Sequence, residues 1–272
     1  MFDVYLRRWD LLPDGPPILT RAAHLLPVRH RGEPAMLRLE EGRSGALIRS
    51  GTLMAWWAGD GAARVLAQAE DALLLERATG PRSLADMARD GQDDEVCAIL
   101  CAVAARLHRP RGAPPPDLIS LEDGFAELWP AASAQGGILA RCAATARELL
   151  AQPREVVSLH GDLHHDNVLD FGARGWLAID PAGMLGERGF DFANIFTNPD
   201  LTDPTRPVAT RPGRFARRVE VVAQSAGLER RRLLCWILAW AGLSAAWFLG
   251  DGDPAAIDLE IAALAAAELD RA

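Results

Sequence analysis

The alternation of apolar and polar residues divides the chain into a strand-rich first part and a helical second part. In the first part, short apolar runs typical of strands are separated by turn residues, with one turn at Gly32. The run 44–57 has the composition of a helix. The expected strands cover residues 18–26, 35–39, 64–66 and 72–75.

A break follows at Thr79-Gly80-Pro81, where neither a helix nor a strand continues easily. Beyond it the apolar residues recur with a helical period. Ser83, three residues before Asp86, is expected to cap the first helix of this part. Helices are expected at 95–108, at 121–132, at 137–151, and from 191 onward apart from a proline-rich loop at 198–212.

The helical pattern is interrupted between residues 156 and 182. A short apolar strand is expected at 156–159, and a β-hairpin follows with strands 168–171 and 176–179 on either side of a glycine-bounded turn. We therefore predict two lobes, a small and mainly β lobe followed by a larger helical lobe that carries one hairpin.

The longest apolar run, Leu233–Leu249, fits either a membrane span or a buried helix. Its 17 residues are at the short limit for a span, and Gly242 and Ser244 interrupt it. We interpret it as a helix buried in the second lobe. The N-terminus lacks the apolar segment of a signal peptide, so we expect a cytoplasmic protein.

Composition narrows the classes of function. The net charge of −8 argues against nucleic acid or an anionic membrane as a partner. All 29 basic residues are arginine, which excludes any mechanism that needs a lysine. Cys97 and Cys101 are four residues apart, unlike the usual zinc-binding pairs, and we expect buried, reduced thiols.

The residues with the clearest chemistry flank the expected hairpin. Asp162 and Asn167 are five residues apart in LHGDLHHDNVL, and Asp180 ends the hairpin in GWLAIDPAG. Phosphoryl transfer needs a carboxylate beside the incoming hydroxyl and hard oxygen ligands that hold Mg²⁺ on the phosphates. The D-x-x-x-x-N spacing is that of the protein-kinase catalytic loop. We therefore predict an α+β, protein-kinase-like bilobal fold with an N-lobe at 1–78 and a C-lobe at 79–272.

These two segments resemble the aminoglycoside phosphotransferases, and in particular the branch of streptomycin 6-kinases, also called the aminoglycoside/hydroxyurea resistance kinases. The segments GEPAMLR, LLLERA and LSAAW fit the same branch. The resemblance covers nearly the whole chain and is tight from 159 to 196. It implies a kinase that transfers phosphate from ATP or GTP, with Mg²⁺, to a hydroxyl of a small molecule such as streptomycin.

The resemblance implies a role for each matching residue of the catalytic segment. Asp162 would orient and deprotonate the substrate hydroxyl, and Asn167 and Asp180 would bind Mg²⁺. Asp191 would brace the backbone of the loop, and His160 would support it by packing. The two remaining histidines of the segment, His164 and His165, are interpreted as polar loop residues.

The nucleotide side departs from the family pattern. Arg38 stands where the family has a lysine that grips the α- and β-phosphates, and in LLLERA the residues Glu76 and Ala78 would contact the nucleotide. The helix 44–57 lacks the glutamate that usually holds this lysine, since Glu40 and Glu41 come too early. The loop from Thr20 to His24 also lacks the expected glycines or serines.

Streptomycin-like substrates carry guanidinium groups, so carboxylates near the cleft are candidates for binding them. Chain position and charge select Glu187 and Asp200, followed by Asp203, Asp251 and Asp253. Two hypotheses follow from the whole pattern. The chain is an active kinase of a small, cationic, hydroxylated substrate, or it is a weak or silent kinase fold retained as a binding module, which the altered residue 38 would explain.

Overall fold

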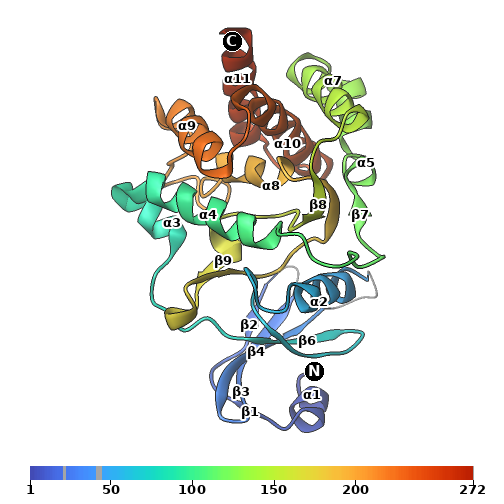
Figure 1. Cartoon of the computed structure of the whole chain (residues 1–272), viewed down its shortest axis with the longest axis vertical. Coiled ribbons are helices and arrows are strands. Elements are labelled where there is room, and N and C mark those ends of the chain that lie inside the picture. Colours follow the sequence, from blue (N-terminus) through green and yellow to red (C-terminus); the bar gives the residue numbers. More distant parts are fainter. Residues whose placement is uncertain (21–22, 41–44, 272) are drawn as a thin grey trace.

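The computed structural model describes residues 1–20, 23–40 and 45–271. The chain forms two lobes stacked along its long axis (Figure 1), with the mainly β N-lobe at one end and the helical C-lobe at the other. This arrangement confirms the predicted α+β, two-lobed fold.

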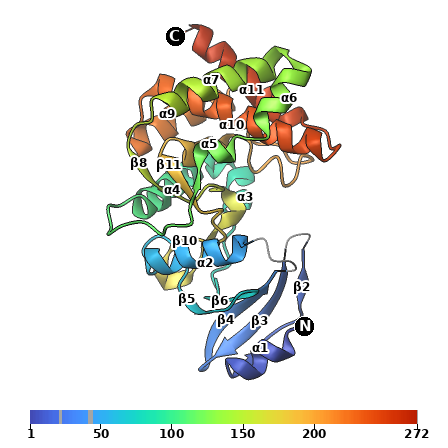
Figure 2. The same cartoon turned by 90° about the vertical axis from the view of Figure 1, so that its right-hand side faces the viewer.

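The N-lobe is built on one antiparallel sheet with the strand order β1-β3-β4-β6-β5, and β2 pairs with the outer part of β3. The sheet is flanked by helix α1 on one face and helix α2 on the other (Figure 2). The bounds of these elements are α1 Asp3–Arg8, β1 Leu11–Pro13, β2 Ile18–Leu19, β3 His24–His30, β4 Glu33–Leu39, α2 Ala46–Trp57, β5 Val65–Gln68 and β6 Ala72–Glu76.

The alternation of side chains along β4 gives its two faces different partners. Ala35, Leu37 and Leu39 are buried in a small core shared with α1. Met36 and Arg38 point to the opposite face, which lines the cleft between the lobes. Because side chains alternate between the two faces of a strand, Arg38 lies on the face of β4 that lines the cleft.

The C-lobe is a helical bundle with two small β elements on its cleft side. β9 and β10 form the predicted hairpin, and β11 lies between β7 and β8. The bounds are α3 Leu84–Met87, α4 Asp93–Leu107, β7 Ile119–Ser120, α5 Leu121–Gly124, α6 Leu128–Gln135, α7 Gly137–Ala151, β8 Val156–Leu159, β9 Val168–Asp170, β10 Trp176–Ala178, β11 Met184–Glu187, α8 Phe190–Ala193, α9 Arg214–Ala226, α10 Arg230–Gly250 and α11 Ala256–Arg271.

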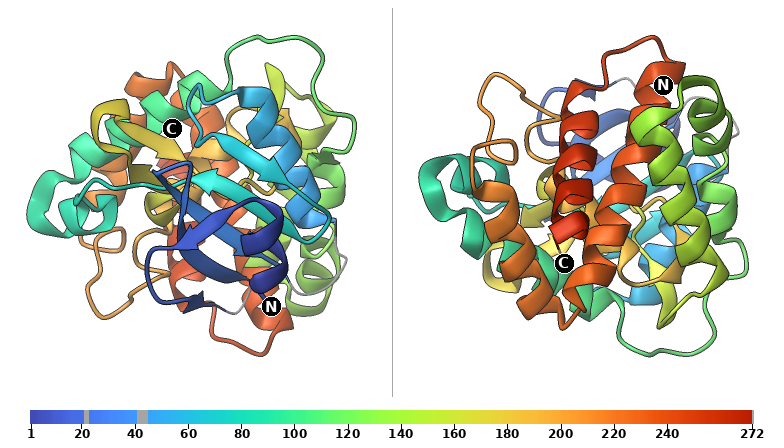
Figure 3. Two further views of the ribbon diagram at one scale, coloured as in Figure 1. Left: turned by 90° about the horizontal axis from the view of Figure 1, so that it is seen from below. Right: turned by 90° about the horizontal axis from the view of Figure 1, so that it is seen from above.

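Helix α10 is the centre of the C-lobe and packs against α7, α8 and α11. The right-hand view of Figure 3 shows α10 and α11 side by side, with α7 on the other flank of α10. By length and composition α10 could cross a membrane, but 72% of its most apolar 18-residue window is buried inside the lobe. The structure thus confirms the interpretation of this run as a buried core helix.

Two sequence expectations need correction. The run 18–26 is two strands and not one: β2 ends at Leu19 and β3 begins at His24, and between them the N–H of Ala23 donates to Oγ1 of Thr20 at 2.9 Å. The helix expected at 121–132 is two helices, α5 and α6. Pro130 lacks an N–H and is tolerated only in the first turn of a helix, so α6 begins afresh at Leu128.

The segment that joins the lobes runs from the end of β6 to α3, whose first turn is capped by Ser83 as predicted: Ser83 Oγ accepts the Asp86 N–H at 3.2 Å. We propose that the N-lobe ends at Ala78, within this segment. A second connection comes from the hairpin, where the N–H of Ala178 donates to the carbonyl of Gly61 at 2.8 Å. Both connections fix the cleft in which the predicted site residues lie.

Candidate active site

The catalytic-loop segment connects β8 to β9. It turns at Gly161 and enters β9 through a 3₁₀ turn at His165–Asn167. Gly161 has a φ of +82°, and a Cβ at this position would lie 2.9 Å from the side chain of Met184. Glycine adopts this φ without strain and has no Cβ to clash with Met184, so the turn that presents Asp162 to the cleft depends on it.

Asp191, at the start of α8, fixes the backbone of this loop. Its carboxylate accepts the N–H of His160 at 2.9 Å and the N–H of Gly161 at 2.7 Å. Its Oδ2 also lies 2.8 Å from Nε2 of His108, which follows the last residue of α4. Because Asp191 is buried, these bonds are shielded from water and fix the loop strongly. The structure confirms the expected bracing role.

The three histidines of the segment have different surroundings. His160 is fully buried, donates from Nε2 to the carbonyl of Ile179 at 2.9 Å, and has a pKa lowered by burial, as its expected packing role requires. His165 is buried and its pKa is well below the usual value for the same reason. Nε2 of His164 lies 3.7 Å from the carboxylate of Asp162. Burial opposes the charge of His164, but this carboxylate raises its pKa above the usual value.

Both carboxylate oxygens of Asp162 accept a hydrogen bond from an amide side chain. Oδ2 accepts from Nδ2 of Asn167 at 2.9 Å, and Oδ1 accepts from Nδ2 of Asn194 at 2.8 Å. Burial alone would raise the pKa of Asp162, but the neighbouring His164 and the hydrogen bond from Asn167 outweigh it and hold the pKa below its usual value. Asp162 is therefore ionised at neutral pH, and its side chain is 45% exposed to the cleft.

Asn167 and Asp180 lie next to each other because the hairpin folds back on the loop. The N–H of Ile179 donates to the backbone carbonyl of Asn167 at 2.9 Å, which places the following residue, Asp180, beside it. The amide nitrogen of Asn167 donates to the backbone carbonyl and to Oδ2 of Asp162, so its amide oxygen is directed away from that residue. Amide and carboxylate oxygens are hard donors that suit Mg²⁺. The three residues predicted from the motif thus lie together.

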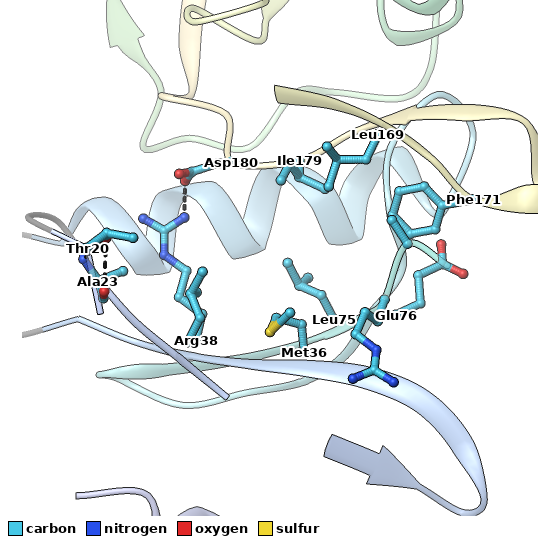
Figure 4. Close-up of a pocket in the computed structure, with 13 residues that line it drawn as sticks. Thr20, Ala23, Met36, Arg38, Leu75, Glu76, Leu169, Phe171, Ile179 and Asp180 are labelled. Carbon is cyan, nitrogen blue, oxygen red and sulfur yellow. Dashed lines mark hydrogen bonds and ion pairs between the residues drawn. The ribbon is translucent and has the colours of Figure 1, made fainter. Parts of the chain in front are cut away.

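A cavity of about 320 Å³ opens beside Asp180, between the two lobes (Figure 4). Leu169, Phe171 and Ile179 of the hairpin form one wall, and Met36 and Leu75 of the N-lobe sheet form the other. An apolar slot with Arg38 and Asp180 at one end suits a nucleotide, with the base between the walls and the phosphates beside Arg38 and Asp180. The cavity is lined by Thr20, Ala23, Leu25, Met36, Arg38, Leu75, Glu76, Arg77, Ala78, Leu169, Phe171, Ile179 and Asp180.

The three residues predicted to contact the nucleotide all line this cavity. Arg38 forms an ion pair with Asp180 (Figure 4), and its Nε is buried without a partner among the described residues. The carboxylate of Glu76 is turned to the hairpin, where it pairs with Arg174, so only the backbone of Glu76 is left for a nucleotide. Ala78 also lines the cavity.

Arg38 is not held by a carboxylate on the N-lobe helix α2. No acidic residue occurs in α2, so the carboxylate that holds Arg38 is Asp180 on the opposite lobe. Glu40 lies before the helix and accepts the N–H of Leu47 at 3.0 Å. Glu41 and residues 21 and 22 of the preceding loop lie outside the described residues. The position at which the resemblance places a lysine is therefore occupied by an arginine that bridges the two lobes.

Two adjoining hollows lie on the other side of Asp162. One, of about 410 Å³, is lined by Asp123, Gly161 and residues of α10, and the other, of about 260 Å³, by His164, Asn194 and the loop after α8. Asp162, Trp240 and Trp247 line both. Trp247 is 42% exposed, and Trp240 is buried behind it with ring centroids 5.5 Å apart. Asp162 thus faces a second cavity with an aromatic wall and a carboxylate.

The substrate residues predicted from charge are wrong in both main cases. Glu187 is buried and pairs with Arg232, and its carboxylate also accepts Nε1–H of Trp236 at 2.7 Å. Asp200 is fully buried and accepts backbone N–H groups from residues 208–210 at 2.7–3.1 Å. Neither residue lines the hollows beside Asp162. Burial of a carboxylate is costly without such partners. Both carboxylates therefore serve to hold loops in place.

Sequence reasoning missed the residues that do line these hollows. Asp123 follows Ser120 by three residues, a spacing that indicates a helix cap, and Ser120 Oγ does accept its N–H at 3.1 Å. Trp247 lies in the LSAAW segment, which matched the family without a role. Asn194 follows Asp191 by three residues and was not predicted to have a role. Each is brought to Asp162 by tertiary packing and not by local spacing.

Two lobes with a nucleotide-sized slot between them, lined by Asp180, and with Asn167 and Asp162 next to that residue, define a kinase of the small-molecule class. The chain belongs to the aminoglycoside/hydroxyurea antibiotic resistance kinase family, whose sequence pattern it matches over residues 8–252. This finding confirms the resemblance inferred from the motifs.

Individual relatives agree with this assignment. The chain is 56% identical over 272 residues to streptomycin 3''-kinase from Klebsiella pneumoniae, covering 97% of this chain and 100% of that protein. It is 34% identical to streptomycin 6-kinase from Streptomyces griseus, covering 94% and 84%. The fold is similar to that of aminoglycoside phosphotransferase APH(3'')-Id from Streptomyces rimosus in complex with ADP and streptomycin, with a TM-score of 0.61, 19% identity, and coverage of 88% and 96%.

Proposed function

We propose that this protein is a cytoplasmic kinase that transfers the γ-phosphate of ATP to a hydroxyl of streptomycin. The observation that carries the proposal is the position of Asp162. It lies between a nucleotide-sized slot and a second cavity, and Asn167 joins it to Asp180 at the inner end of that slot. The 56% identity to a streptomycin kinase over nearly the whole chain supports the choice of substrate.

The reaction places each residue in a defined role. The substrate oxygen forms a bond to the γ-phosphorus, the bond between that phosphorus and the oxygen of ADP breaks, and Asp162 accepts the hydroxyl proton. Asn167 and Asp180 would hold Mg²⁺ through their side-chain oxygens. The bound ion supplies positive charge that neutralises the phosphate oxygens. Arg38 would contact the phosphates, which requires its guanidinium to share or leave Asp180.

The nucleobase would enter the apolar slot between Met36 and Phe171. Its polar edge would face the backbone of residues 76–78, which connects the lobes and lines the slot. The side chain of Glu76 takes no part in this contact because Arg174 holds it. This geometry supports ATP as the donor without any lysine in the protein.

Trp247 and Asp123 are proposed to bind a cationic group of the substrate. The exposed indole of Trp247 and the exposed carboxylate of Asp123 line the same hollow as Asp162. A flat guanidinium or an alkylated ammonium stacks favourably on an indole face, and a carboxylate supplies the opposite charge. Trp247→Leu should raise KM for streptomycin about tenfold with kcat nearly unchanged, and Trp247→Phe should keep most of the affinity.

We also propose that the phosphate is added at the 3''-position, because identity to the 3''-kinase is well above that to the 6-kinase. The two hydroxyls lie on different rings of streptomycin. Fragmentation of the product by mass spectrometry therefore shows which ring carries the phosphate. A phosphate on the cyclitol ring, which bears the 6-hydroxyl, would contradict the 3''-position.

The central test is Mg²⁺-dependent transfer of labelled phosphate from ATP to streptomycin. Asp162→Ala and Asp180→Ala should each lower kcat by at least 100-fold, since each removes an oxygen that acts on the reacting groups. Asp270→Ala, which removes an exposed carboxylate on α11, is the matched control and should be unaffected. Unchanged transfer in the first two variants would refute the assigned roles.

The Arg38–Asp180 ion pair favours one second reading, a fold that binds nucleotide but transfers phosphate weakly or not at all. Calorimetric titration with ADP and Mg²⁺ separates the two readings when it is combined with the transfer assay. Binding without transfer to streptomycin or to other hydroxylated amines would support the silent module.

A further inference from the structure

Asn194 lies directly behind Asp162, on the side away from the metal-binding residues. It follows α8 in a short 3₁₀ turn, Asn194–Phe196, and its side chain is buried. Its Nδ2 donates to Oδ1 of Asp162 at 2.8 Å, while Asn167 donates to the other oxygen. The carboxylate is therefore held from both ends.

The orientation of the Asn194 amide is fixed by its own neighbours. Its Oδ1 accepts Nδ2–H of Asn198 at 2.8 Å and the hydroxyl of Thr197 at 3.2 Å. A flipped amide would place two donors against these groups and an oxygen against a carboxylate. The nitrogen must therefore face Asp162.

Asn198 is itself anchored by a buried ion pair. Arg218 donates to the backbone carbonyls of Asn198 and Ile195 at 2.7 Å each. The guanidinium makes two bonds to the buried carboxylate of Asp93 at 2.6 and 2.9 Å. A continuous series of contacts thus runs from α4 and α9 through the turn after α8 to the carboxylate in the cleft.

We propose that Asn194 is a positioning residue for phosphoryl transfer, which holds the Asp162 carboxylate in one orientation so that a free lone pair faces the substrate hydroxyl. This inference rests on the proposed function of Asp162. Asn194 contacts Asp162 and does not need to touch the reacting atoms. Without it the carboxylate can rotate about its Cβ–Cγ bond and about χ1, and small errors of alignment at a reacting group have large kinetic effects.

The first test is the kinetics of Asn194→Ala. We expect kcat to fall by about 10–100-fold, with KM for streptomycin and the affinity for ADP within twofold of the wild type. Asn194→Asp keeps the volume but replaces the donor by a second carboxylate, so its loss should be at least as large. Leu149→Ala on α7 is the stability control. It removes a buried side chain that lines none of the hollows, and it should lower the melting temperature without this loss of kcat.

The second test is a double-mutant cycle with Asn198. Asn198→Ala should lower kcat less than Asn194→Ala does, and its effect should vanish when Asn194 is already alanine, because it acts through that amide. Additive losses, or a kcat that falls only in step with the melting temperature, would overturn the inference. If Asp162→Ala were fully active, the proposed function would fail first. If Asp162→Ala were inactive but Asn194→Ala had normal kcat, this inference alone would fail.

Discussion

Arg38 occupies the position at which the family resemblance places a lysine, and it uses its size to reach Asp180 across the cleft. A lysine is a compact point charge, whereas a guanidinium can contact a carboxylate or a phosphate through two nitrogens. Since α2 carries no acidic residue, nothing on the N-lobe helix would hold a lysine in this chain. The arginine at position 38 therefore suits a chain whose α2 has no carboxylate to hold a lysine.

Arg38→Lys should consequently weaken nucleotide binding and not restore the family pattern. Loss of the second nitrogen and of a fixed orientation should raise the Kd for ADP by about tenfold. Isothermal titration with ADP in the presence of Mg²⁺ measures this directly. Arg29→Lys, an exposed N-lobe pair with Asp14, serves as the control, and equal affinities in both variants would contradict the explanation.

Asp258 is a second unusual residue, buried on α11 with neither oxygen hydrogen-bonded among the described residues. Burial raises the pKa of this carboxyl to about 6, and the nearby hydroxyl of Ser244 offsets only part of the effect. The folded protein therefore binds this proton more tightly than the unfolded chain. Stability is unaffected below the unfolded pKa, falls as the pH rises from there to about 6, and levels off above it because the carboxyl is then ionised in both states.

Asp258→Asn should raise the free energy of unfolding at pH 8 by about 2–3 kcal/mol, because no charge then has to be buried. At pH 4 the same change should have little effect. Urea unfolding at the two pH values measures both numbers. A substitution that destabilises the protein equally at both would show that Asp258 is charged and paired in the folded state.

At the scale of elements, the β9–β10 hairpin does more than carry Asp180. The turn between its strands bears Arg174, which pairs with Glu76 at the end of β6 and donates to the carbonyl of Gly59 at 2.7 Å. The hairpin thus touches the N-lobe next to the segment that joins the lobes. These contacts hold the hairpin, which forms one wall of the nucleotide slot, against the N-lobe.

Breaking this pair should loosen the slot. Glu76→Gln is expected to cost about 1 kcal/mol of stability, since both side chains are largely buried, and to raise KM for ATP several-fold. Arg174→Gln should have the same effect, and the double variant should be no worse than either single one. The exposed pair of Arg141 with Asp270 provides the comparison, for which little change is expected.

What the sequence predicted depended on whether the relevant contact is local. The hairpin, the loop before it and their three polar residues lie within 20 residues, so spacing alone brought them together. Asn194 and Trp247 reach Asp162 only through the packing of α8 and α10, which leaves no spacing to find. Glu187 was misjudged because its partner, Arg232, is 45 residues away, and charge without the partner does not distinguish a ligand from a structural ion pair.

At the scale of the whole molecule, the nucleotide slot is shared between the lobes, with walls from β4 and β6 on one side and from the hairpin on the other. A ligand in this slot contacts both lobes, which also share a hydrophobic core through Leu53 and Trp57 of α2. Nucleotide binding should therefore stabilise the chain as a unit.

ADP with Mg²⁺ at 100 times its Kd should raise the melting temperature by about 5 °C or more. Chelation of the metal with EDTA should remove most of this shift, because the phosphates then lose the link to Asn167 and Asp180. The Asp180→Ala variant should show a smaller shift that EDTA does not change. A wild-type shift of full size in EDTA would indicate that the nucleotide binds without the proposed metal ligands.

The guanidinium that faces the nucleotide slot has a practical consequence for chemical labelling. Affinity reagents built as acyl phosphates of ATP tag the ε-amine that most kinases present to the phosphates, and this protein presents no such amine. Surveys that detect kinases by acylation of this ε-amine will therefore not detect this protein. A nucleotide analogue that carries a dicarbonyl group, which condenses with guanidines, is suited to label Arg38.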